Sequence, residues 1–398
     1  CSDLGGWKMK EKILSYFEIE KLNTTVKREV LAGFTTFISM AYILFVNPTV
    51  LGASGMDEGA VFTATALASA IGCVLMGVLA RYPIGTAPAL GINAFFAYSV
   101  CLGMGIPWET ALAGVFVASL IFILITIFKL REMIIDAIPA DLKYAISGGI
   151  GLFIAFLGLS EGGIIVSNES TLVGLGSLNV GSTWLTIFGL VVTAILLVRR
   201  VPGGIFIGMA ATTILGLVTG LIPMPSEIVA AAPSLKPTFL VALKHVGDIN
   251  SLQMWVVVLT FLLVTFFDTA GTLVGLANQA GFMKDNKMPR VGKALASDST
   301  AMLAGSLFGT SPVGAFVESS AGIAVGGRSG ITAITTGDFL LVRLVLFSIT
   351  ISCYFTSNCT SIDYGRSIDG TIFATNRMGK LRDCDPFILD LDRHAFDL

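Results

Sequence analysis

The chain has 398 residues, of which 54% are hydrophobic and 13% charged, and its mean hydropathy is +0.83. This composition is typical of a polytopic membrane protein and not of a soluble domain. The net charge of −2 provides no basic surface for nucleic acid, and the two His and six Cys show no CxxC or Cys/His spacing that would indicate a metal site, a cofactor or a disulfide framework. Neither a P-loop nor a GxSxG motif is present, so we expect no ATP-driven pump within this chain and no hydrolase or other enzyme.

Eight apolar runs follow one another along the chain, and several have the roughly 20 residues that a membrane-spanning helix needs. They cover residues 30–46, 60–80, 110–128, 145–160, 183–198, 204–222, 253–275 and 293–308. Between the second and third runs, segment 83–103 is interrupted by prolines and glycines, which predicts a half-helix that reaches the middle of the membrane. This makes seven elements before the pattern begins again near Trp255.

One membrane segment occurs twice in the chain. Residues 66–69, Ala-Leu-Ala-Ser, recur as residues 294–297, which is 228 positions later, and flanking matches keep nearly the same offset. Because one copy holds an odd number of elements, the second copy should lie upside down in the membrane. The sequence therefore predicts an all-α inverted-repeat protein, with its first repeat at 29–252 and the start of the second at 253–337.

Basic residues alternate between the predicted loops. Lys and Arg gather in the N-terminal segment 1–28, at Arg81, at 129–143, at 199–200 and at 284–293, whereas the loops around 57–58, 109 and 161–169 contain none. By the positive-inside rule, the N-terminus and the even-numbered loops are cytoplasmic, with Lys236 and Lys244 as exceptions. We expect a multi-pass protein of the cell membrane without a cleavable signal peptide.

Inverted repeats with interrupted helices are typical of secondary transporters, whose binding site lies near the bilayer midplane. The two interrupted elements here are 83–103 and 309–330. Asn93 and Glu318 lie within them, and Asp268 lies in the apolar run 253–275. A carboxylate at the bilayer centre costs roughly 2.5 to 3.5 kcal/mol, so it is rarely retained without a partner or a task. The alternative is that each acid only caps the start of a broken helix, and that the amide only satisfies unwound backbone.

An aromatic residue, Phe316, precedes Glu318 by two positions and could stack against a flat heteroaromatic ring. Phe95 and Phe96 carry the same suggestion more weakly. With 27 Phe in the chain, the alternative is that these side chains face lipid or fill the core.

Four segments together resemble a known family, the hypoxanthine/guanine branch of the xanthine/uracil (nucleobase:cation symporter-2) permeases. They are Leu31–Pro48, Ala87–Phe96, Phe267–Thr272 and Val317–Gly322, and the resemblance covers about Glu20 to Gly337. It implies fourteen elements in two inverted repeats of seven, a core domain and a gate domain, and proton-coupled uptake of purine bases by alternating access.

The resemblance also implies roles for individual residues. Asn93 with Gly91, Asp268 and Glu318 match positions essential for binding or transport, and Phe316 matches an aromatic position that lines the base. Family members often have a second acid three residues before the Asp of Phe-Asp-Thr, where this chain has Thr265. That departure leaves open whether Asp268 contacts the base or carries the proton, a role that Glu318 could share.

The residue types suit a purine. Guanine and hypoxanthine present N–H donors along one edge, and a carboxylate accepts hydrogen bonds from them. An amide side chain can hydrogen-bond to a neighbouring donor and acceptor on the base. An adenine permease is the alternative within the class, and a purine sensor or channel that needs no proton gradient is the alternative outside it. The expected partners are the base, protons and the lipid bilayer. The sequence leaves the base preference and the oligomeric state open, a homodimer included.

The tail 338–398 does not match the family. It is rich in charged residues where apolar helices are expected. If the tail is translated back into codons that the genetic code permits and these are read one nucleotide further on, two stretches give apolar sequences similar to the family's last helices. We therefore expect a shift of reading frame near Gly337, a second repeat that is truncated, and a chain that does not transport as written.

Overall fold

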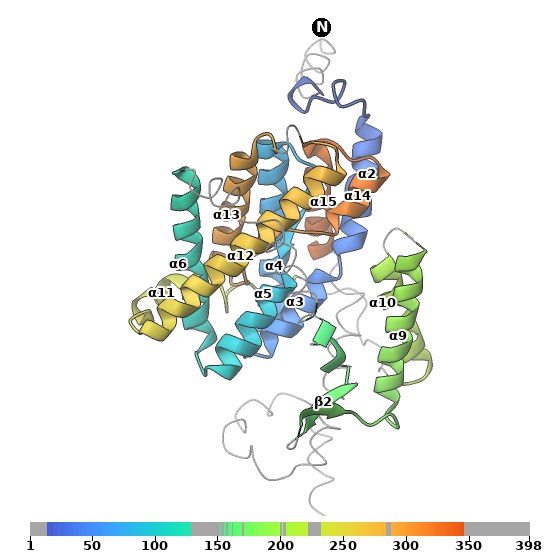
Figure 1. Ribbon diagram of the computed structural model, residues 1–398, viewed down its shortest axis with the longest axis vertical. Coiled ribbons are helices and arrows are strands. Elements are labelled where there is room, and N and C mark those ends of the chain that lie inside the picture. Colours follow the sequence, from blue (N-terminus) through green and yellow to red (C-terminus); the bar gives the residue numbers. More distant parts are fainter. Residues whose placement is uncertain are drawn as a thin grey trace, which may run out of the picture.

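The computed structural model describes residues 14–128, 162–168, 171–199, 204–221, 232–283 and 288–345, with residue 201 and six positions between 152 and 160. Most of this part is helical, and the helices lie side by side in a bundle (Figure 1). Five helical stretches of the described part are long and apolar enough to cross a membrane. These are Val26–Gly52, Glu58–Ala80, Trp108–Ile127, Gly181–Val198 and Leu252–Gln279.

The first two predicted spans are present. Helix α2 (Val26–Met40) begins at Thr25, whose side chain accepts a hydrogen bond from the backbone of the first turn, and α3 (Ile43–Gly52) continues it after a break at Ala41 and Tyr42. Helix α4 (Glu58–Leu75) is capped by Asp57 and passes into the wider turn η1 (Met76–Ala80). Side-chain oxygens at these starts satisfy backbone N–H groups that have no partner within the helix.

Both interrupted elements contain a strand and a short helix. In the first repeat, β1 (Thr86–Pro88) leads into α5 (Leu90–Ala94) and η2 (Phe95–Gly103); in the second, β4 (Val313–Ala315) leads into α14 (Ser319–Val325). The two strands pair with each other in antiparallel register, with Ala87 opposite Gly314. The sequence predicted the two breaks but not the strands that pair across them.

The packing of the long helices repeats itself between the two halves. Helix α6 (Trp108–Ile127) packs against α12 (Leu252–Gln279) and α13 (Val291–Phe308), while α15 (Gly330–Val345) packs against α2 and α4. If α2 corresponds to α12, α4 to α13 and α6 to α15, then the contacts that α6 makes in one half are the contacts that α15 makes in the other. This supports the duplication read from the sequence.

The predicted tail begins within an ordered helix. Helix α15 continues through Gly337 to Val345, and Leu340 is fully buried. The rest of the predicted tail, from residue 346, lies outside the described residues, as does most of the apolar run 145–160.

A separate pair of helices, α9 (Gly181–Val198) and α10 (Gly204–Val218), stands to one side of the bundle in Figure 1. The two pack on each other, and α10 also contacts α2. A hairpin of β2 (Ile165–Asn168) and β3 (Leu172–Leu175) precedes them, and α11 (Val241–Lys244) with η3 (Val246–Asp248) connects them towards α12. Most α9 side chains are at least partly exposed, as expected of a helix that meets lipid or a further element.

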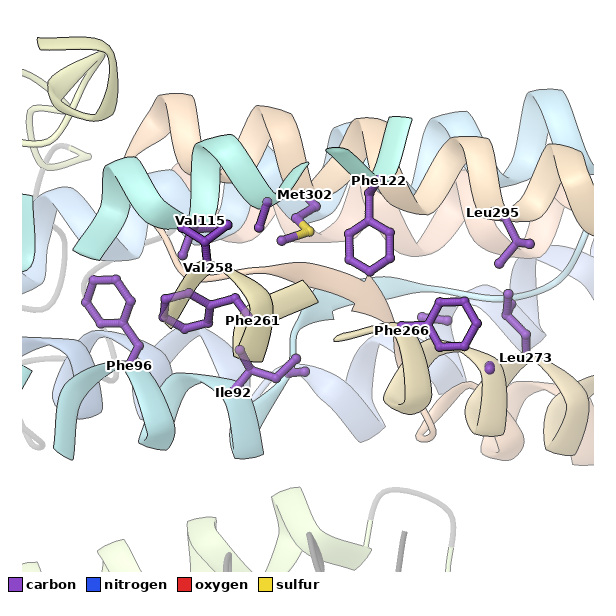
Figure 2. Packing of buried hydrophobic residues seen from close by; sticks show 14 of the residues in the cluster. Ile92, Phe96, Val115, Phe122, Val258, Phe261, Phe266, Leu273, Leu295 and Met302 are labelled. Carbon is purple, nitrogen blue, oxygen red and sulfur yellow. The ribbon is translucent and has the colours of Figure 1, made fainter. Parts of the chain in front are cut away.

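The apolar core joins the two repeats around the paired strands. Figure 2 shows Ile92 and Phe96 beside Phe261 of α12, and Phe122 of α6 in the same layer. The rings of Phe96 and Phe261 lie with their centroids 6.1 Å apart, and all four of these side chains are almost completely buried. Small residues allow the closest approaches: a Cβ on Gly330 would lie 2.0 Å from the carbonyl oxygen of Gly77. Such small-residue contacts are common where membrane helices meet.

One buried carboxylate, Glu29 of α2, caps the start of α15 from the other repeat. It accepts hydrogen bonds from the backbone N–H of Arg328 (3.0 Å) and of Ser329 (3.0 Å), and from the hydroxyl of Thr332 (2.6 Å). Its side chain has no exposed surface. A negative charge is favourable at a helix N-terminus, so this contact fixes α15 against α2.

We expect Glu29→Gln to destabilise the fold. The amide replaces one acceptor oxygen by an NH2 group that faces donors, and leaving a buried donor unpaired costs about 1 to 3 kcal/mol. The melting temperature of the purified protein in detergent should therefore fall for Glu29→Gln and stay unchanged for Glu20→Gln, whose side chain is exposed. Equal melting temperatures for both variants would contradict this account of α15.

Candidate functional site

The site is built on the β1–β4 ribbon, from which α5 and α14 diverge at opposite ends. At one end, the backbone N–H of Ala89 donates to the carbonyl oxygen of Pro312 (3.3 Å). At the other end, the backbone N–H of Phe316 donates to the carbonyl oxygen of Gly85 (3.0 Å). Unwound backbone at membrane depth has no water to pair with, so the strand before each half-helix depends on the strand of the other repeat for its backbone partners. The ribbon therefore holds residues from two distant parts of the chain at a fixed separation.

Asn93 lies on α5, at the end of the ribbon where Pro312 is found. Its side chain is fully buried, and its Oδ1 accepts a hydrogen bond from the hydroxyl of Ser311. Its Nδ2 has no hydrogen-bond partner among the described residues. Because buried polar groups are rarely left unpaired, this amide donor is a candidate ligand contact. Gly91, two positions earlier on the same helix, is partly exposed.

A buried polar cluster supports Asn93. Asn47 of α3 donates from its Nδ2 to the hydroxyls of Thr65 (2.6 Å) and Thr310 (2.8 Å), and its Oδ1 lies 3.3 Å from the Ser311 hydroxyl. All five side chains of this cluster have no exposed surface. Sequence reasoning did not assign Asn47 or Ser311, because nothing local shows that residues this far apart meet.

Glu318 lies at the start of α14, at the other end of the ribbon, and is partly exposed. It makes no capping hydrogen bond to this helix; instead it accepts one from the hydroxyl of Tyr42, at the break between α2 and α3. The alternative that this acid only caps a helix is therefore not what the structure shows. Tyr42 was not singled out from the sequence, although it lies in one of the segments that carry the family resemblance.

Phe316 is only 5% exposed, so it does not face lipid. Its ring packs against that of Tyr42, with centroids 6.2 Å apart and planes tilted by 43°. Tyr42 thus contacts the aromatic residue and the acid of the same half-helix.

Helix α12 brings Thr265 and Asp268 to the ribbon, since it contacts both β4 and α14. Thr265 is 2% exposed and its hydroxyl has no hydrogen-bond partner among the described residues, whereas Asp268 is partly exposed. The charges of Asp298 and Glu318 both act on Asp268, which places three carboxylates in one region.

Asp298 of α13 is the acid that sequence reasoning missed. It is 1% exposed, accepts from the hydroxyl of Thr269 (3.1 Å), and accepts from the backbone N–H of Ala315 in β4 (3.1 Å). It therefore ties α12 and α13 to the ribbon. A signal was present in the repeat: 228 positions earlier, the first copy has Ala70. A charge that appears in only one of two duplicated membrane segments indicates a task specific to that copy.

Known proteins are similar to this chain in sequence and in fold. Residues 27–356 match the profile of a permease family, that of the xanthine/uracil permeases, and so extend past Gly337. The guanine/hypoxanthine permease PbuG of Bacillus subtilis is 53% identical over 356 residues, covering 87% of this chain and 80% of PbuG. The adenine permease AdeP of Escherichia coli is 42% identical over 334 residues, covering 83% and 74%.

Among solved structures, the transmembrane domain of the cyanobacterial bicarbonate transporter BicA superposes with a TM-score of 0.59 at 15% identity, over 87% of this chain and 91% of that one. This likeness shows the fold, an inverted-repeat transporter fold of two times seven elements. By sequence, the chain belongs to the xanthine/uracil permease family.

Proposed function

We propose that the protein carries purine bases with a 6-oxo group, guanine and hypoxanthine, across the cell membrane. One arrangement supports this most directly. The two half-helices that follow the strands of one ribbon carry an amide donor without a partner among the described residues, Asn93 Nδ2, and a partly exposed carboxylate, Glu318. The names of the relatives PbuG and PbuO, both guanine/hypoxanthine permeases, agree with it.

The chemistry of the base matches these two groups. The N1–H of both bases, and the 2-amino group of guanine, donate hydrogen bonds that the Glu318 carboxylate accepts, and a charged acceptor makes such bonds stronger. The O6 atom accepts a hydrogen bond from Asn93 Nδ2. Phe316 supplies an aromatic face, and Gly91 lies two positions before Asn93 on α5. Thr265 offers one further hydroxyl from α12.

Transport requires that this site open to each side in turn. Asn93 is fully buried here, so a base reaches it only after the surrounding elements move apart. We assign the helices around the ribbon to a core, and α9 with α10 to a gate that contacts α2 through α10. Alternating access then moves the core against the gate, with the N-terminal segment 1–28 on the cytoplasmic side.

Proton coupling is assigned to Asp268, with Glu318 as its partner. Carboxylates held together at membrane depth repel one another, and uptake of one proton removes part of that repulsion. The electrostatic repulsion between Asp268 and Glu318 links the proton to the acid that is proposed to hold the base.

The test of the binding role is Glu318→Gln, which keeps the size of the side chain but turns one acceptor into a donor. The binding free energy of guanine to the purified protein should become less favourable by about 1.5 to 3 kcal/mol, which is the usual contribution of a hydrogen bond to a charged group. Glu109→Gln, a change to a partly buried acid at the start of α6, serves as the matched control and should bind normally. Unchanged guanine affinity in Glu318→Gln would remove this acid from the site.

The test of the coupling role is Asp268→Asn, reconstituted in vesicles with an imposed proton gradient. Both this variant and its wild type carry the alternative reading frame after Gly337, because the chain as written is expected not to transport. This variant should still exchange labelled for unlabelled guanine, yet no longer accumulate it, because no proton binds at this position. Wild-type accumulation should disappear with an uncoupler, which a channel or a sensor would not show. If Asp268→Asn accumulates guanine with normal pH dependence, another group carries the proton.

A further inference from the structure

We infer that Ser311 fixes the orientation of the Asn93 amide and thereby sets the preference for a 6-oxo purine over a 6-amino purine. The inference rests on the proposed function. It assigns selectivity to a residue that has no need to touch the base.

The first step is the orientation of Asn47. The Thr65 hydroxyl donates its single proton to the carbonyl of Val61 (2.7 Å), so towards Asn47 it can only accept. The group of Asn47 that faces Thr65 must then be the NH2 group, which also reaches Thr310. Asn47 therefore presents its carbonyl oxygen, an acceptor, to Ser311.

The second step is the orientation of Asn93. The Ser311 hydroxyl has one proton and faces two amide oxygens, and it lies closer to Asn93 Oδ1 than to Asn47 Oδ1, which is 3.3 Å away. The proton therefore goes to Asn93, which directs the amide oxygen of Asn93 towards the serine. The Nδ2 group consequently points away from the cluster, and it has no partner among the described residues. Because Ser311 and Asn93 have no exposed surface, this orientation is set by protein contacts and not by bulk water.

The third step is what an oriented donor selects. O6 of guanine or hypoxanthine accepts a hydrogen bond from Nδ2, whereas the 6-amino group of adenine brings a second donor to the same place. Two facing donors leave both unpaired, and a site built in this way rejects the wrong base strongly. Without the Ser311 hydroxyl, the Asn93 amide can turn over and present Oδ1 to the 6-amino group.

The experiment measures guanine, hypoxanthine and adenine binding to the purified protein in detergent, for the wild type and Ser311→Ala. The ratio of guanine to adenine affinity should fall by about tenfold, the change that one hydrogen bond of usual strength produces. The matched control is Ser306→Ala, which removes an equally buried hydroxyl that donates to the carbonyl of Leu303 in α13. Its ratio should equal that of the wild type.

Two further variants keep the test decisive if Ser311→Ala does not fold. Ser311→Cys retains a weak donor of similar size and should give a smaller loss of preference. Asn93→Asp removes the Nδ2 donor and should lower the preference to the part that Glu318 sets, since N1 of adenine has no proton for this acid to accept. A guanine-to-adenine ratio within about twofold of the wild type in folded Ser311→Ala or in Asn93→Asp would overturn the inference, since a lost hydrogen bond changes affinity by more. Failure of the wild type to bind any of the three bases would overturn the proposed function as well.

Discussion

The arrangement of this protein depends on one constraint: backbone that leaves a helix inside the membrane must find its hydrogen-bond partners within the protein. β1 and β4 meet this constraint by pairing with each other across the internal repeat. The pairing fixes where α5 and α14 begin, and with them Asn93 and Glu318. The proposed site for a polar ligand thus lies where the fold already needs polar contacts between two distant segments.

Two buried acids hold the ribbon and helix α15 in place by contacts that a helix bundle alone would not require. Asp298 accepts from the backbone of Ala315 and from Thr269, and Glu29 caps α15 from the opposite repeat. Both acids are buried with their acceptor oxygens occupied by donors, which stabilises their charge. Asp268 and Glu318 differ, because they are partly exposed. This contrast separates the acids that hold the structure from those that we propose for the base and the proton.

Much of the fold follows from local patterns, and the site follows only in part. Hydrophobic runs, the repeated Ala-Leu-Ala-Ser and the Pro/Gly interruptions predicted the spans, the duplication and the two broken elements. A charge or amide in an apolar run also predicted Asn93, Asp268 and Glu318 as candidates. Their supporting residues could not be found in this way, because Tyr42 and Glu318 are 276 positions apart and Asn93 and Ser311 are 218 apart. Such pairs become visible only once the repeats are folded against each other.

The proposed function joins these features, since one base would bridge the two half-helices and each half-helix belongs to a different repeat. The most direct measurement is a structure of the protein with guanine bound. The account predicts the base between α5 and α14, with its N–H edge about 2.7 to 3.0 Å from the Glu318 carboxylate and O6 at a similar distance from Asn93 Nδ2. Guanine bound elsewhere, in contact with neither residue, would contradict it.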